Sequence, residues 1–138
     1  MTMTLENLCI VLVAPNGALN IGSVARAMAN FGVNDLRLVT PQTDHLQDAA
    51  RKMAVKATPI LEQATLFEDL ASALTDCRFA IGTTRRFGKY RENLLHPDEA
   101  ARTLLPLLAK GRVALVFGRE DRGLKTEELD LCQRLITI

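Results

Sequence analysis

Three short stretches of the chain gather the residue types that could do chemistry, and the first runs from Pro15 to Arg26 (PNGALNIGSVAR). In it Asn20 precedes Ser23 and Arg26, and Asn30 follows at a further spacing of four, so a helix would place the last three on one face. The other neighbours of Arg26 are small and apolar, and a guanidinium in such surroundings needs a partner. The alternative is that Asn20 only caps the helix and Arg26 is an ordinary surface cation.

The second stretch is basic and aromatic and runs from Thr83 to Asn93 (TTRRFGKYREN). Its cations alternate with two rings: Arg85, Arg86, Lys89 and Arg91 with Phe87 and Tyr90. Guanidinium forks suit phosphates, and aromatic rings stack on bases. The pattern favours contact with phosphate or nucleic acid over a solvated surface loop.

The third stretch, GREDRGL, runs from Gly118 to Leu124 and places Glu120 between two arginines. A glycine at the end of a strand lets a ligand approach the backbone closely. The same glycine would also suit a plain turn that binds nothing, so the stretch alone leaves both interpretations open.

Several other chemistries are not expected, because their patterns are absent. The chain has no GxGxxG, no GxxxxGK[ST], and no HxxxH or CxxC spacing. Dinucleotide, P-loop and zinc sites are therefore not predicted, and no metal is expected. His45 and His96 each border a predicted helix start, which favours a helix-end or solvent position over catalysis.

Composition limits the class of protein. With 138 residues, 48% of them hydrophobic, the chain fits one domain with a single core. Seventeen basic and 16 acidic residues give a net charge of +1, so any RNA contact must be local. The three cysteines are far apart in apolar runs, which predicts buried thiols in a reducing compartment. No leader pattern and no apolar run of roughly 18 residues is present, so we expect a soluble cytoplasmic protein without membrane contact.

The elements that must position these stretches alternate between strand and helix. Strands are predicted over Cys9–Ala14, Leu36–Thr40, Ala64–Leu66, Cys77–Thr83, Val113–Phe117 and Leu135–Ile138. Helices are predicted over about Ile21–Phe31, His45–Ala54 with a cap at Thr43 or Asp44, Glu68–Leu74 and Pro97–Leu108, with a short one from Thr126. Pro59 is expected to close the second helical region.

This alternation predicts an α/β fold, a mostly parallel sheet with helices on both faces. Ligands in such sheets bind beyond the carboxyl ends of the strands. The loops that begin at Pro15, Thr84 and Arg119, and whatever follows Ile138, should therefore meet at one edge of the sheet.

Two of the stretches resemble the first two sequence motifs of the SpoU/TrmH branch of the SPOUT methyltransferases. Asn20 to Met28 (NIGSVARAM), followed by NFG, resembles motif one, and Leu115 to Leu124 (LVFGREDRGL) resembles motif two. The motifs occur in the family's order and spacing, and the similarity extends over essentially the whole chain. The nearest group is the TrmJ-like one, whose members methylate ribose in the anticodon loop of tRNA.

The resemblance implies an S-adenosylmethionine-dependent RNA 2'-O-methyltransferase that forms a homodimer and needs no metal. It places the cofactor at the backbone around Thr83, Thr84 and Arg85, then at Gly118 and Ile138. Arg26 would reach the cofactor site of the other subunit, with Asn20 and Glu120 shaping the site. Arg86, Lys89 and Arg91 would bind the RNA, and the expected RNA is tRNA.

The resemblance also carries expectations about the chain's extent and its chemistry. The family forms a trefoil knot with a third, Ser/Asn-rich motif after the last strand, and that motif is not found before Ile138. We therefore expect residues 1–138 to be a single SPOUT domain truncated before the knot. Because the pKa of arginine lies above about 12, Arg26 is expected to orient the ribose hydroxyl rather than to act as its base.

Two alternatives of another class stay open at this point. One is an RNA-binding module that has no activity in this truncated form. The other is a flavodoxin-like domain that binds a phosphorylated small molecule at the same edge of the sheet.

Overall fold

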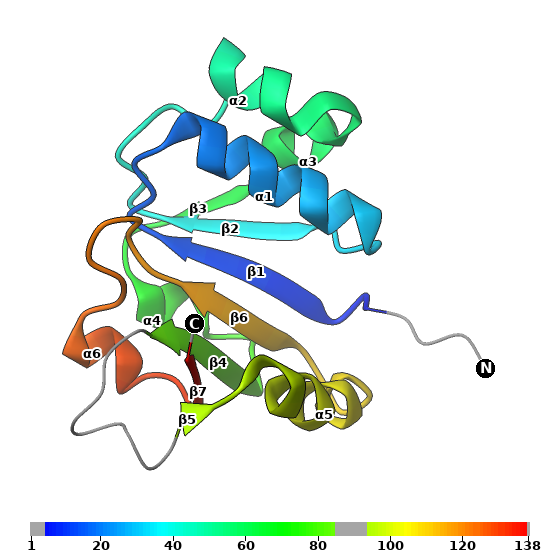
Figure 1. Cartoon of the computed structure of the whole chain (residues 1–138), viewed down its shortest axis with the longest axis vertical. Helices are drawn as coiled ribbons and strands as arrows, with labels where there is room; N and C mark the ends of the chain where they lie inside the picture. The colour runs from blue at the N-terminus through cyan, green and yellow to red at the C-terminus, as the bar shows by residue number, and fades with distance from the viewer. Residues whose placement is uncertain (1–4, 85–93, 138) are drawn as a thin grey trace.

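A buried parallel sheet forms the centre of the molecule, which we describe from a computed structural model covering residues 5–84 and 94–137. Seven parallel strands are found in these ranges, in the order β3-β2-β1-β6-β4-β7-β5 (Figure 1). Their bounds are β1 (Leu8–Val13), β2 (Asp35–Val39), β3 (Thr65–Phe67), β4 (Phe79–Thr84), β5 (Leu94–Leu95), β6 (Val113–Phe117) and β7 (Arg134–Thr137). The predicted parallel α/β fold is confirmed.

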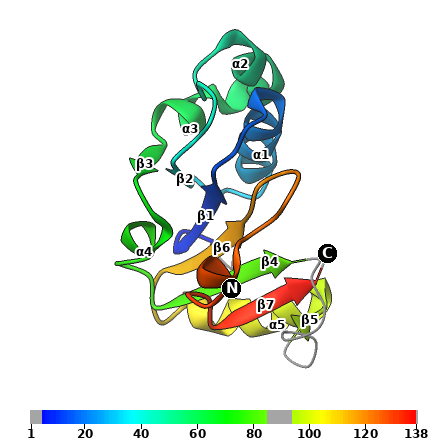
Figure 2. The same ribbon diagram turned by 90° about the vertical axis from the view of Figure 1, so that its left-hand side faces the viewer.

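Helices cover both faces of the sheet, as Figure 2 shows. On one face lie α1 (Ala18–Asn30), α2 (Asp48–Ala54), the 3-10 helix η1 (Val55–Ala57), α3 (Thr58–Glu62) and α5 (Pro97–Leu108). On the other lie α4 (Leu70–Ala73) and α6 (Thr126–Leu129). Side chains of β1 alternate between these layers: Ile10 packs toward α1, and Val11 toward α4. Burial on both faces explains why the β1 segment is continuously apolar.

The predicted elements agree with the structure most closely in the second half of the chain. The helix Pro97–Leu108 and the strand Val113–Phe117 have the predicted bounds. The other predicted strands are found with ends shifted by one or two residues. The prediction contained no counterpart of η1, α3 or β5.

Three details of the predicted helix ends were wrong. Helix α1 begins at Ala18 with Gly17 as its N-cap, so Asn20 lies inside the helix and does not cap it. Helix α2 begins at Asp48 with Gln47 in the N-cap position, and Asp44 instead accepts a hydrogen bond from the backbone N–H of Leu46 in a local turn. Pro59 lies in the first turn of α3 and opens a helix, a position where a missing N–H costs nothing.

A buried guanidinium on β2 holds the ends of several elements together. Arg37 is 7% exposed, and its Nη1 donates to the carbonyl of Ala73 on α4. Both of its terminal nitrogens also bind carboxylates, with Nη1 2.6 Å from Asp76 and Nη2 3.0 Å from Asp35. Hydrogen bonding from Arg37 lowers the pKa of Asp76 to about 2.

The three cysteines are free thiols, as predicted, although Cys77 and Cys132 are only partly buried. No helix within the described ranges has the length and apolarity needed to cross a membrane.

Candidate functional site

The first and third stretches meet at the carboxyl edge of the sheet, and Glu120 joins them. Its carboxylate accepts hydrogen bonds from the backbone N–H of Asn16, at 3.0 and 2.9 Å, and of Gly17, at 3.0 Å. Because Gly17 is the N-cap of α1, a carboxylate here also meets the positive end of the helix dipole. Glu120 thus fixes where α1 begins relative to the loop after β6.

The loop that carries Glu120 is held rigid from within. A Cβ on Gly118 would collide with the backbone of Gly123 and Leu124, so the chain folds back tightly on this glycine. Arg119 binds Glu128 on α6 at 2.9 Å and also donates to the carbonyl of Gly123. Burial raises the pKa of Glu128, but the hydrogen bonds from Arg119 and from the backbone of Lys125, together with the charges of these two residues, outweigh burial and lower the pKa overall. The absence of a side chain at Gly118 therefore has a reason in the loop's own packing.

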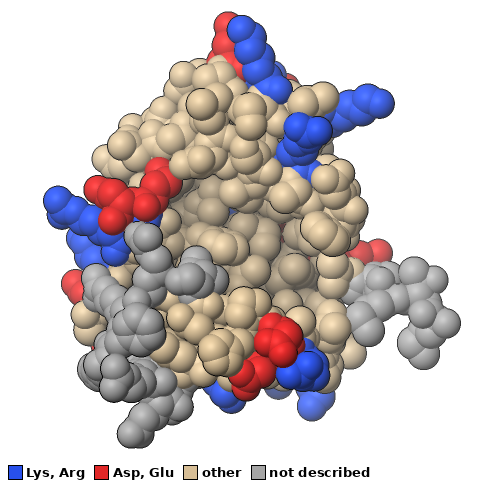
Figure 3. Space-filling model, in the orientation of Figure 1, with Lys and Arg blue, Asp and Glu red and all other residues tan. Residues whose placement is uncertain are grey.

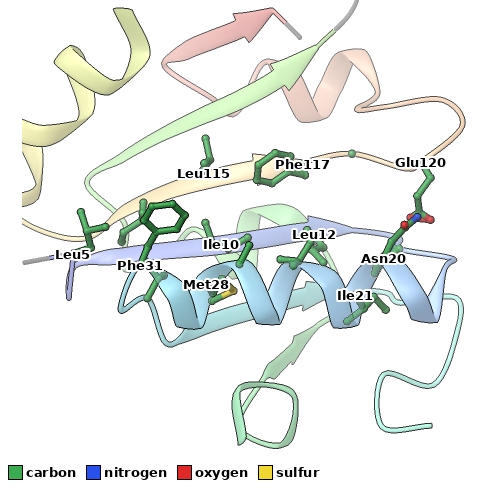
Figure 4. A pocket seen from close by; sticks show the side chains of 16 residues that line it. Leu5, Ile10, Leu12, Asn20, Ile21, Met28, Phe31, Leu115, Phe117 and Glu120 are labelled. Carbon is green, nitrogen blue, oxygen red and sulfur yellow. The ribbon is translucent and has the colours of Figure 1, made fainter. Parts of the chain in front are cut away.

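An apolar groove begins beside Glu120 and runs between α1 and the sheet. Its volume is about 500 Å³, and Figure 3 shows this face hollowed at its centre, where charged side chains are absent. Figure 4 shows Asn20 and Glu120 together at one end of the groove and Leu5 and Phe31 at the other. Both Asn20 and Glu120 are exposed. The polar pair therefore closes one end of an otherwise apolar surface.

The expected cofactor residues Thr83 and Thr84 end β4, next to the ends of β6 and β7. Both are 5% exposed, and Thr83 Oγ1 donates to the carbonyl of Val116 at 3.2 Å. Thr84 is in register with Thr137, so the carboxyl ends of β4 and β7 lie side by side. The described residues at these strand ends carry no charged side chain, which suits a neutral nucleoside and does not repel a cation.

Arg26 lies away from that strand end. It is exposed on α1, and it forms no ion pair within residues 5–84 and 94–137. Its position is roughly 12 Å along the helix from the N-terminus of α1. Two strand spacings, about 10 Å, further separate β1 from β4. The backbone of Arg26 is therefore far from the Thr84 region of its own chain.

Part of the predicted site lies outside the described residues. This holds for the cofactor residues Arg85 and Ile138 and for the RNA-binding residues Arg86, Lys89 and Arg91. No cluster of metal-ligating side chains occurs among the residues that the structure describes.

Two features of the site were missed from the sequence. The backbone N–H groups of Asn16 and Gly17 have no residue-type signal, and their partner Glu120 is more than 100 positions away. The apolar groove had a partial signal, since its lining includes apolar positions of two elements: Val24 and Met28 on α1, and Leu115 and Phe117 on β6. The sequence alone does not show that these two elements lie together.

Comparison with known proteins identifies the family. The sequence profile of the SpoU rRNA methylase family matches residues 7–138. The fold, with two motif loops joined at the carboxyl edge of a parallel sheet, agrees with this match. The chain belongs to the SpoU methylase family.

Individual relatives point to the same group. The chain is 44% identical over 130 residues to tRNA (cytidine/uridine/adenosine-2'-O-)-methyltransferase TrmJ of Pseudomonas aeruginosa, covering 94% of this chain and 50% of the relative. It is 39% identical to tRNA (cytidine-2'-O-)-methyltransferase TrmJ of Methanocaldococcus jannaschii, covering 94% of this chain and 56% of that protein. A methylase family structure from Haemophilus influenzae matches with a TM-score of 0.89 and 34% identity, covering 98% of this chain and 57% of that one. The chain thus spans about half the length of these relatives.

Proposed function

We propose that this protein methylates the 2'-hydroxyl of a ribose in RNA, with S-adenosylmethionine as the methyl donor. The particular RNA that we propose is tRNA. The observation that carries the proposal is the junction of the two motif loops through Glu120, beside the uncharged ends of β4, β6 and β7. The relatives named as tRNA 2'-O-methyltransferases support the same activity. Membership of the family disfavours the flavodoxin-like alternative.

The cofactor residues are proposed from the strand ends. Thr83, Thr84 and the backbone at Gly118 would hold S-adenosylmethionine, which supplies a methyl group on a sulfonium centre. A solved structure of the SpoU methyltransferase AviRb from Streptomyces viridochromogenes, which shares this fold with a TM-score of 0.67 and 14% identity, contains AdoMet. This supports the cofactor class, and the contacts expected from Arg85 and Ile138 stay predictions.

In the proposed reaction this chain's residues act by position rather than by proton transfer. A guanidinium is a poor base and a good forked donor, so Arg26 orients the ribose hydroxyl and a neighbouring phosphate, and the hydroxyl proton passes to solvent as the methyl group is transferred. The Glu120 carboxylate accepts hydrogen bonds from the backbone N–H groups of Asn16 and Gly17, and it thereby holds the start of α1 in place. Asn20, beside Glu120, offers an amide to the substrate at the same edge (Figure 4). Alignment of hydroxyl and methyl group then supplies the rate gain.

We propose that Arg26 serves the site of a second subunit in a homodimer. Its distance from β4 of its own chain argues for this arrangement. Two large apolar side chains are exposed along and at the end of α1: Leu19, at 55%, on the face that carries Arg26, and Phe31, at 72%, at the C-cap beside the groove. A two-fold axis near α1 would bury these side chains and carry each Arg26 across the interface.

Other expectations from the sequence stay predictions: RNA binding by Arg86, Lys89 and Arg91, a single domain with a knot, and a cytoplasmic location.

The function is tested by methyl transfer from isotopically labelled S-adenosylmethionine to unmodified tRNA, with the protein at its natural length. The digested RNA is then analysed by mass spectrometry. We expect a 2'-O-methylated nucleoside. Label on a base, or no transfer to any tRNA, would contradict the proposal.

A further inference from the structure

A second cavity, of about 440 Å³, opens over the carboxyl ends of β1 and β2. It differs from the apolar groove because polar and charged residues line it. Its lining includes Ala14 and Thr40 at the two strand ends and Arg119, Asp121, Arg122 and Lys125 in the loop after β6. None of these residues has a role in the proposed methyl transfer.

The backbone at the floor of this cavity is held in an unfavourable conformation. Ala14 and Thr40 follow the paired residues Val13 and Val39, and both have positive φ, 49° and 40°. The left-handed region disfavours residues with a Cβ, above all a β-branched one such as Thr40. The segments that follow β1 and β2 both turn away from the sheet edge at these residues, which leaves the hollow over the strand ends. Backbone held in this way occurs preferentially where ligands bind.

The charge of the cavity is predominantly positive, and two of its cations are available. Arg119 is already engaged by Glu128. Arg122 approaches only Asp121, at 3.7 Å, and the two side chains are 83% and 78% exposed, so this ion pair is weak. Lys125 is exposed and forms no ion pair with any residue of the described ranges.

The cavity also shares a wall with the proposed active site. Asn16 lines the cavity, and its backbone N–H is one of the groups that Glu120 binds. The site and the cavity therefore share the loop that begins at Pro15. An RNA strand whose ribose enters the site would pass its neighbouring linkage over the cavity.

We propose that this cavity binds a phosphodiester group of the RNA next to the methylated nucleotide, with Arg122 and Lys125 as its cationic partners. Arg122 supplies forked hydrogen bonds and Lys125 a point charge, a pair that suits a phosphate. The inference rests on the proposed function, because the position of the ribose defines which phosphate is meant. It adds a basic contact separate from the stretch Arg85–Arg91.

The test measures tRNA affinity against salt, between roughly 50 and 200 mM, for wild type, Arg122→Gln, Lys125→Gln and the double variant. Each lost phosphate contact should reduce the slope of log affinity against log salt by about 0.7 to 0.9, and the double variant should bind about tenfold more weakly at the low-salt end. Lys110→Gln is the matched control. It removes an exposed cation after α5, at the opposite edge of the sheet, and should leave the slope unchanged.

A second measurement identifies the phosphate itself. Ethylation of one linkage beside the methylated nucleotide should weaken binding by wild type and have little further effect on the double variant. A double variant with the wild-type salt slope and the wild-type ethylation pattern would overturn the inference, even if wild type methylates tRNA. If the slope falls as expected but wild type transfers no methyl group, the phosphate site stands and the proposed function fails.

Discussion

Glu120 illustrates why single residues of this site have to be interpreted in three dimensions. Its match to the second family motif implied a group that shapes the site. In the structure its carboxylate satisfies backbone N–H groups of Asn16 and Gly17. It therefore positions the start of α1, and we propose that Asn20 and, from a second subunit, Arg26 contact the substrate at this edge.

Arg26 has a role that substitution can define. Lysine at this position keeps the charge but loses the planar fork, so Arg26→Lys should lose nearly as much activity as Arg26→Ala, while cofactor binding survives in both. Single-turnover methyl transfer against pH, with the protein at its natural length, is the measurement. A base role predicts the opposite pattern, because lysine deprotonates more readily: Arg26→Lys would then approach wild-type rates at high pH.

The lowered pKa of Asp76 leads to a prediction of how the free energy of unfolding depends on pH. Its pKa is lowered to about 2 by Arg37, from an ordinary value of 3.8, so its contribution is present above about pH 4 and is lost as pH falls toward 2. Because the side chain is 57% exposed, we expect Asp76→Asn to cost only about 1 kcal/mol near neutral pH. Denaturant unfolding of both proteins from pH 7 to pH 2 measures this. A difference that stays constant down to pH 2 would show that the carboxylate charge is not its source.

At the scale of elements, the sequence predicts strands and helices that have strong local signals. Pro97 followed by two acidic residues marks a helix start, and the run Val113–Phe117 is apolar and β-branched; both were predicted with the bounds found. The two-residue strand β5 could not be predicted, since it exists only through pairing with β7. The order of the strands could not be predicted either, because β6 inserts between β1 and β4 through contacts distant in sequence.

The contact between α1 and α2 gives a prediction for one glycine. A Cβ on Gly22 would meet the carbonyl oxygen of Ala50 and lie 2.8 Å from Cβ of Met53. Alanine normally stabilises a helix relative to glycine, but here we expect Gly22→Ala to lower the free energy of unfolding by about 1–3 kcal/mol. Ala29→Ser, which adds one atom on the exposed side of α1, is the control and should stay within about 0.5 kcal/mol. A stabilised Gly22→Ala variant would mean that α2 packs less closely than described.

At the scale of the whole molecule, the proposed dimer follows from exposed apolar side chains on α1. Introducing glutamate at Leu19 and Phe31 should convert a dimer to a monomer, because both would place charge in the proposed interface. Sedimentation velocity measures the change. Leu66→Glu is the control, since Leu66 is 55% exposed on the edge strand β3 and is not part of α1. Wild type that is monomeric at all concentrations, or dissociation by Leu66→Glu alone, would argue against this interface.

The central claim is that the protein acts on a ribose hydroxyl, and one atom of the substrate tests it directly. Once the methylated nucleotide is known, a tRNA with 2'-deoxyribose at that single position should bind with nearly unchanged affinity and accept no methyl group there. The measurement is labelled methyl transfer to the matched ribo and deoxy substrates, alongside their dissociation constants. Transfer to the deoxy substrate at the ribo rate would contradict the account, because the methyl group would then be going to some other atom.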